Sequence, residues 1–450
     1  MLRPGQSVML CALALLTLGV VMVNSAAMRV DPIDVAAPGV HASTDPSVVT
    51  REGITARSIL LSRSTLYMAV AVGAMGLASR LPVRRLAKRL ETTPWPKPLG
   101  EVGWLAAGAL SIIAVLGLVY VPGIQRVVNG SARWITLPIP GLESFQPSEV
   151  AKWAIVPLLA WYAARRATSG TVKGGMREFW KGLAPAIVCL AAVAGMIVLE
   201  DLGTGALIAM VGAIVLLAAG ARLWHFLMFV PPAAAAVTLA ILQSPYRVQR
   251  IITFIDPFAD PQGAGYHMIQ SMSTVAGGGI FGRGLGHGLQ KFGYLPEDTT
   301  DFLFAVICEE LGLAGAMLVI CLYAAIVFSA VKVVRRADLL TLKLVAIGVA
   351  ATVTIQALIN MAVVTGLGPT KGIALPLLSS GGTGWILTAT MLGVLAAIDR
   401  SAPETEDEPE LVVRARMPRE PSRPATIAPS GPVLEPVVVK PRVRLAHPKP

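Results

Sequence analysis

Charged residues are scarce in this sequence. Only 14% of its 450 residues are Asp, Glu, Lys or Arg, whereas roughly 25% is usual in a soluble globular domain. The shortage excludes a large water-exposed surface of ordinary composition, so a soluble multidomain enzyme is a poor interpretation. Cysteine is also rare, and Cys11, Cys189, Cys308 and Cys321 each lie within or beside an apolar run. Their spacing matches neither a metal site nor a disulfide framework.

Long hydrophobic runs take the place of the missing charges. A helix crosses a bilayer with about 20 apolar residues, and runs of that order recur from end to end. We expect spans at residues 7–25, 60–79, 101–121, 148–164, 183–199, 204–220, 224–243, 302–331, 342–366 and 383–399. The sequence therefore predicts an all-α, polytopic integral membrane protein with about ten transmembrane helices. The first run is also compatible with a cleaved signal peptide, since Arg3 precedes it and small residues follow it.

The basic residues gather between the hydrophobic runs. The net charge of +11 comes from 38 Lys and Arg against 27 Asp and Glu, and the cations cluster in residues 80–97, 165–181 and 332–343. With an even number of spans these three segments share one side, which the positive-inside rule assigns to the cytoplasm together with both termini. Because topology explains the cations, nucleic acid is not an expected partner.

This topology leaves residues 26–59, 122–147, 244–301 and 367–382 outside. The loop 244–301, between the seventh and eighth spans, is long and rich in Gly and Pro, yet it also holds many aromatic residues. Connections of this length are usually functional or disordered, and the aromatic content favours an ordered cap. We divide the chain into a transmembrane domain, 1–400, and a disordered Pro-rich cytoplasmic tail, 401–450.

Ionisable residues in spans are costly and mark function by default. Glu149 and Lys152 open the fourth span; Glu149 suits the positive end of a helix, but an ordinary helix start does not explain Lys152. The two can pair at i, i+3, and we favour a substrate-facing pair over a structural one. Asp201 lies in the short connection between the fifth and sixth spans, where a solvated turn and a binding role are equally good interpretations.

The outer end of the eighth span carries the next acidic group. Asp301 lies where the long loop enters this span and can act as a base or metal ligand. Glu309 follows about 12 Å deeper along a helix, and it and Glu310 must be paired or protonated there. Lys371, in a glycine-rich stretch, supplies a point charge suited to phosphate.

Arg247 and Arg250 add cations on the long outer loop. One candidate base, several cations and an amphipathic cap over a hydrophobic body suit a substrate that is half lipid and half anionic head group. A conducted ion would instead need a polar path through the core.

Several multi-part motifs occur in a fixed order over about residues 100–400. They are Val128-Asn129-Gly130 with Arg133-Trp134, Gln146-Pro147-Ser148-Glu149 with Lys152, Asp201-Leu202-Gly203-Thr204, Asp256-Pro257-Phe258 with Gly265-Tyr266-His267-Met268-Ile269-Gln270-Ser271, Gly282-Arg283-Gly284-Leu285-Gly286, Thr300-Asp301-Phe302, Glu309-Glu310-Leu311-Gly312, and Pro369-Thr370-Lys371-Gly372 with Ser379 and Gly381-Gly382. In these motifs the chain resembles the SEDS family (shape, elongation, division and sporulation proteins, the FtsW/RodA/SpoVE group).

The resemblance implies a ten-helix SEDS fold and a peptidoglycan glycosyltransferase that polymerises lipid II on the outer face of the bacterial cytoplasmic membrane. It makes Asp301 the catalytic carboxylate, acting directly or through a divalent cation, Mg or Mn; no other cofactor is expected. The substrate-binding residues implied with it are Glu149, Lys152, Asp201, Arg247, Gln270, Lys371 and Ser379. The expected partners are a class B penicillin-binding protein, undecaprenyl-linked glycan and the division or elongation machinery.

The chain departs from the family pattern at a few positions. Thr300 stands in place of a histidine, Ser380 in place of a tyrosine, and Arg63-Ser64 in place of an Arg-Gln pair. Residues 290–297 favour the division branch and Gly265-Tyr266-His267 the elongation branch; we favour an FtsW-like protein. Two other functions stay open, a lipid II flippase or other transporter, which would place its site near the membrane midplane, and a non-catalytic divisome scaffold.

Overall fold

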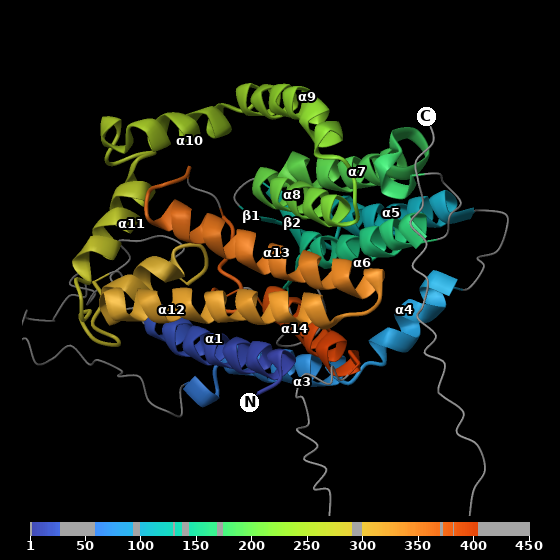
Figure 1. The fold of residues 1–450 in the computed structure, drawn as a ribbon. Coiled ribbons are helices and arrows are strands. Elements are labelled where there is room, and N and C mark those ends of the chain that lie inside the picture. The colour runs from blue at the N-terminus through green and yellow to red at the C-terminus, as the bar shows by residue number, and fades with distance from the viewer. Residues whose placement is uncertain are drawn as a thin grey trace, which may run out of the picture. The chain divides into compact units, whose positions relative to one another are not determined.

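The computed structural model (Figure 1) describes residues 2–27, 59–92, 100–128, 131–136, 144–168, 174–289, 299–369, 372–380 and 382–403. The α-helices are α1 Pro4–Ala26, α3 Arg63–Ala78, α4 Val83–Thr92, α5 Gly100–Gly117, α6 Pro147–Thr168, α7 Ala184–Glu200, α8 Leu202–Ala218, α9 Leu223–Leu242, α10 Pro245–Ile255, α11 Tyr266–Gly277, α12 Leu303–Arg336, α13 Leu340–Val364 and α14 Thr383–Ser401. A helix occupies each of the ten expected places, which confirms the all-α class. Lys371, the motif residues 290–297 and the tail from 404 onward lie outside the described residues.

Not every helix is an unambiguous membrane span. In the described residues five helices are long and apolar enough to cross a bilayer, namely Pro4–Ala26, Gly100–Tyr120, Phe179–Glu200, Leu303–Arg336 and Leu340–Val364. α3 and α4 pass the same test as one span bent by 59°. The apolar stretches of α8 and α9 are shorter, and α6 carries charges at both ends. The count of ten spans therefore stays a prediction.

The N-terminal helix forms part of the core. α1 lies beside α12, α14 and α3 (Figure 1), and its residues Val8, Ala12 and Leu15 are fully buried. Gly19 faces the segment 372–380 so closely that a Cβ there would lie 2.8 Å from the Leu377 carbonyl oxygen. A glycine at this position lets α1 contact the backbone of a segment that also contacts α13.

One small antiparallel sheet interrupts the all-α pattern. Its strands β1 (Gln125–Val128), β2 (Ser131–Thr136) and β3 (Ser144–Phe145) pair in sequence order, with Ile135 opposite Phe145. The sheet was not predicted from the sequence, because its strands are short and lie in a segment expected to be a loop. The sheet positions Arg133, on β2, against the C-terminal end of α7.

The long segment after α9 contains two helices, α10 and α11, which were not predicted from the sequence. α10 begins directly after Ser244 with Pro245 at its first position, where a missing N–H is tolerated. α11 ends at a run of glycines that starts with Gly277. Both helices are short and flanked by Gly and Pro, so their periodicity was lost in the composition of the whole segment.

α12 is broken at Gly312, whose φ of 66° and ψ of −162° are not helical. The break frees backbone groups that pair with the turn after α11. Leu313 N–H donates to the Gly279 carbonyl at 3.0 Å, and Gly284 N–H donates to the Glu310 carbonyl at 2.9 Å. The N-terminal part of α12 is thereby tied to the turn after α11 through backbone hydrogen bonds.

Gly312→Ala is expected to destabilise the protein. A Cβ at this residue would lie 2.3 Å from the Gly282 nitrogen, and the backbone conformation disfavours any side chain, so we expect a loss of about 2–4 kcal/mol. The thermal unfolding midpoint of the purified protein in detergent measures it. Gly73→Ala is the matched control, because no atom lies within 4 Å of a Cβ there. An equal midpoint for both variants would show that the break is not constrained.

Candidate functional site

Asp301 lies two residues before the start of α12, and it is half-buried. Its carboxylate approaches the backbone of Gly372, where an added Cβ would be 2.8 Å from Asp301 Oδ2. Any larger residue at 372 would push the carboxylate away, so the glycine permits the approach. The acidic group thus lies against the segment that directly follows Lys371.

Asn360, on α13, joins Asp301 to this segment. Its side-chain Nδ2 donates to the Asp301 carbonyl and to the Ile373 carbonyl, each at 2.8 Å. The side chain is 2% exposed. Two carbonyl acceptors require the NH₂ group on this side, so the chemistry fixes the orientation of the amide. Its Oδ1 is buried and has no hydrogen-bond partner in the described part of the chain.

Gln356 lies one helical turn before Asn360, on the same face of α13. Its Nε2 donates to the Ala374 carbonyl at 2.8 Å, and its Oε1 accepts from Lys152 Nζ at 2.9 Å. The two amides were missed by the sequence analysis because they are uncharged. The available signal was their spacing of four residues inside an apolar run, which puts two polar side chains on one face.

Glu149 and Lys152 form the ion pair that their spacing predicted, with Lys152 Nζ 2.8 Å from each carboxylate oxygen. With Gln356, these contacts account for the three donors of the ammonium group. Lys152 is 2% exposed, whereas the side chain of Glu149 is 15% exposed. The substrate-facing role of the pair stays a prediction, and Glu149 is the member that reaches the surface.

Ser379 closes the segment 372–380 into a compact turn. Its hydroxyl accepts from Leu375 N–H at 2.9 Å, and its carbonyl accepts from Trp385 Nε1 at 2.6 Å. The next residue, Ser380, donates its N–H to the Thr299 carbonyl at 2.9 Å. The turn is therefore fastened both to the start of α14 and to the chain just before Asp301.

Asp201 caps α8. Its carboxylate accepts from the N–H groups of Gly203 and Thr204 and from the Thr204 hydroxyl, at 2.8–3.2 Å, a usual N-cap arrangement. Gly203 in turn lies against the Ile373 side chain. Asp201 therefore holds a helix start beside the turn 372–380, and a direct role in binding substrate stays a prediction.

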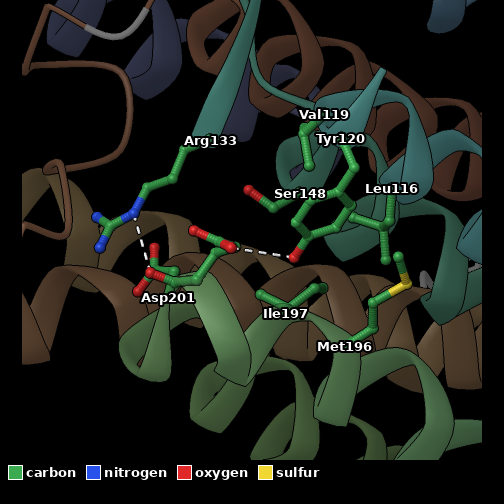
Figure 2. Close-up of a pocket in the computed structure, with 9 residues that line it drawn as sticks. Leu116, Val119, Tyr120, Arg133, Ser148, Met196, Ile197 and Asp201 are labelled. Atoms are coloured by element: carbon green, nitrogen blue, oxygen red, sulfur yellow. Dashed lines mark hydrogen bonds between the residues drawn. The ribbon is translucent and has the colours of Figure 1, made fainter. Parts of the chain in front are cut away.

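A small pocket lies next to Asp201 (Figure 2). Arg133 Nε donates to the Glu200 carbonyl at 3.0 Å, and the Tyr120 hydroxyl donates to Glu200 Oε1 at 3.0 Å. The other lining residues are Leu116, Val119, Ser148, Met196 and Ile197. Its open volume of ≈ 30 Å³ is large enough for water but too small for a sugar.

Arg247 lies on α10 and Gln270 on α11. Arg247 Nη2 donates to the Val198 and Leu199 carbonyls at 3.2 and 3.1 Å, so it caps the C-terminal end of α7. Gln270 is half-buried on α11, which is fastened to α13 by a hydrogen bond from the Ser271 hydroxyl to the Val364 carbonyl.

Glu309 and Glu310 are buried, and they hold the turn after α11. Glu309 Oε1 accepts from Leu289 N–H at 3.0 Å and lies 3.7 Å from Arg283 Nε. Glu310 Oε2 accepts from the Ser25 hydroxyl at 2.6 Å. Each carboxylate therefore has a hydrogen-bond donor at its depth, and a structural role for the two residues stays a prediction.

The described residues contain no preformed metal site, because no group of three His, Cys, Asp or Glu side chains lies close enough to bind one ion. A divalent cation at Asp301 would therefore draw most of its oxygen ligands from substrate phosphate and water. Mg²⁺ commonly binds in this way, through one or two carboxylates, so the residues present fit such a cation.

Comparison with known proteins agrees with the motifs. The family model of the FtsW/RodA/SpoVE cell cycle proteins matches residues 6–404. The probable peptidoglycan glycosyltransferase FtsW of Aliivibrio salmonicida is 37% identical over 71% of this chain and 76% of its own length. The protein of the same name from Thioalkalivibrio sulfidiphilus is 35% identical over 88% and 89% of the two chains.

The fold agrees as well. A solved structure described as the structural coordination of polymerization and crosslinking by a peptidoglycan synthase complex matches with a TM-score of 0.62 and 24% identity, over 88% of this chain and 98% of that one. Since the family model spans most of the chain, and relatives above 30% identity cover more than two thirds of it, the chain belongs to the FtsW/RodA/SpoVE family.

Proposed function

We propose that this integral membrane protein is a peptidoglycan glycosyltransferase that polymerises lipid II on the outer face of the bacterial cytoplasmic membrane. The names of its relatives support the activity. One observation carries the assignment of the site: Asp301 is a half-buried carboxylate whose backbone is held by the buried amide of Asn360. A base fixed in this way is what glycosyl transfer to a sugar hydroxyl requires.

In the proposed reaction Asp301 removes the proton from the 4-hydroxyl of the acceptor sugar. The oxygen forms a bond to the anomeric carbon of the donor, the bond from that carbon to the pyrophosphate oxygen breaks, and undecaprenyl pyrophosphate leaves with the electron pair. Lys371, next in sequence to Gly372, supplies a cation for the developing negative charge. A bound Mg²⁺ or Mn²⁺ would supply further positive charge to the pyrophosphate.

The proposed orientation has both termini in the cytoplasm. The three basic segments of the sequence meet at one end of the helices: Arg165 Nη1 donates to the Leu90 carbonyl at 3.0 Å, and Arg84 forms an ion pair with Asp338. Their shared position supports a cytoplasmic face by the positive-inside rule. Asp301, at the start of α12, then lies at the outer end of a helix that finishes with Arg335 and Arg336.

A class B penicillin-binding protein is the proposed partner, within the division machinery. Fluorescent lipid II incubated with the purified full-length protein in vesicles, with and without such a transpeptidase, tests the activity. Glycan polymer supports the proposal. Movement of lipid II across the vesicle membrane without polymer would instead indicate a transporter. If neither polymer nor movement of lipid II is observed, the protein is a scaffold.

Asn360→Ala is expected to slow polymerisation about tenfold to a hundredfold, because it frees Asp301 and the segment 372–374 from each other and small misplacements of reacting groups are costly. Two quantities are measured for the wild type and the variant: the initial rate at saturating lipid II, and the lipid II concentration that gives half of the maximal rate. Loss of positioning lowers the maximal rate more than it raises that concentration.

Thr354→Ala is the matched control on α13, because its hydroxyl only bonds the Ala350 carbonyl of its own helix. We expect it to leave the rate unchanged. A normal maximal rate in Asn360→Ala would show that Asn360 does not position the site, and it would leave the proposed role of Asp301 unaffected.

A further inference from the structure

The segment after α3 leaves the direction of that helix. α3 and α4 are bent by 59° relative to each other across residues 79–82. The connection contains Pro82, which suits the start of a new helix. α4 is therefore a short helix attached to a membrane-embedded helix but turned away from its axis, as a helix lying in a membrane interface would be.

α4 is fixed in this orientation by its neighbours. Arg165 Nη1 donates to the Leu90 and Glu91 carbonyls at 3.0 and 3.3 Å, and Trp161 Nε1 donates to the Leu90 carbonyl at 3.2 Å. Glu91 Oε1 accepts from the Thr341 N–H at 3.1 Å, at the start of α13. The C-terminal end of α4 is thus capped by α6 and joined to α13.

The fixed orientation gives α4 two different faces. Val83 and Ala87 are buried against the helices, whereas Arg85, Lys88 and Arg89 are exposed. The side chains of these three cations make no hydrogen bond or ion pair with any described residue.

The acidic groups near α4 already have partners, and Glu91 on α4 itself accepts from the Thr341 N–H and hydroxyl. Asp338 binds Arg84, and Glu101 binds both Arg165 and Arg166. The exposed face of α4 therefore keeps its positive charge. Leu86, among the three cations, is 58% exposed, which adds an apolar group of the kind that enters the acyl boundary.

We infer that the face formed by Arg85, Leu86, Lys88 and Arg89 binds the head groups of anionic phospholipids. Cations on an interfacial helix attract an anionic membrane surface, and the attachment to α3 keeps this face within reach of the head groups. The observations favour lipid over a protein partner, because an exposed leucine among cations beside a membrane helix matches an interface. The inference is independent of the chemistry at Asp301.

Native mass spectrometry of the purified full-length protein titrated with phosphatidylglycerol tests this, with phosphatidylcholine as the neutral comparison. The variant R85Q/K88Q/R89Q is expected to lower the affinity for phosphatidylglycerol by at least about tenfold, from the contribution of each cation near an anionic surface. Its affinity for phosphatidylcholine should not change. The thermal midpoint without lipid should equal that of the wild type, because the three exposed side chains make no hydrogen bond or ion pair with a described residue.

The matched control is R177Q/K181Q/R222Q, which removes the same charge from exposed residues of other connections. We expect it to retain the affinity for phosphatidylglycerol. An equal loss of affinity for phosphatidylglycerol in this control would show that the effect depends only on net charge, and it would overturn the site on α4. Unchanged affinity in R85Q/K88Q/R89Q would also overturn it and leave this face to a protein partner.

Discussion

Asp301→Asn is expected to lower the rate of lipid II polymerisation by about 10²- to 10⁴-fold, which is the contribution of a general base. The substitution keeps the shape of the side chain and the hydrogen bond that the Asp301 carbonyl accepts from Asn360. It removes only the group that accepts the proton of the acceptor sugar. The measurement is the initial rate of glycan formation from fluorescent lipid II by the purified protein with its partner transpeptidase.

A matched control is Asp260→Asn, which makes the same chemical change between α10 and α11. Asp260 is exposed, and its two carboxylate oxygens accept from the N–H groups of Gly263 and Ala264; the single amide oxygen of an asparagine keeps one of these bonds, and water can accept from the other N–H. We expect this variant to polymerise at the wild-type rate. Full activity in Asp301→Asn, with an unchanged unfolding midpoint, would show that the reaction uses another base.

The sequence could predict helix positions because each apolar run is long and is flanked by charge or by Gly and Pro. It could also predict that Glu149 and Lys152 pair, since that contact lies within one helix. It could not predict that Gln356 completes the surroundings of Lys152, because the two residues are 204 positions apart in the chain. Contacts of that kind depend on how helices pack.

The conformation of α12 was unpredictable for a different reason. Gly312 sits inside an apolar run, where a glycine is usually tolerated within a helix at about 1 kcal/mol. The break appears only when the backbone of residues 279–284 is docked against it, with Leu313 N–H donating to the Gly279 carbonyl. Glycines are visible in the sequence at both 279–284 and 312, but nothing in the sequence indicates that these two parts of the chain are in contact.

Ser379 shows how a motif can identify a residue without its role. The family resemblance selected it as substrate-binding, and its hydroxyl accepts from Leu375 N–H within a buried turn. The side chain is 1% exposed, so the serine shapes the segment 372–380. A contact between Ser379 and substrate stays a prediction, whereas its part in holding Gly372 beside Asp301 follows from the geometry.

The other large effect is expected at the buried ion pair. Glu149→Gln leaves the Lys152 ammonium, 2% exposed, without a countercharge, and breaking such a pair typically costs about 3–5 kcal/mol of folding free energy. Lys152→Met should cost less, because Glu149 is partly exposed and lies at the first turn of α6, where the helix dipole favours an anion. Unfolding midpoints of the two variants measure the difference.

The double variant E149Q/K152M separates a structural pair from a substrate-facing one. If burial dominates, removing both charges restores much of the stability that Glu149→Gln loses, since a buried pair can often be replaced by neutral side chains without penalty. Polymerisation then recovers with stability, because Gln356 still holds the Ala374 carbonyl beside the site. If the double variant is stable but inactive, Glu149 acts on the substrate, and its partial exposure is the route by which it does so.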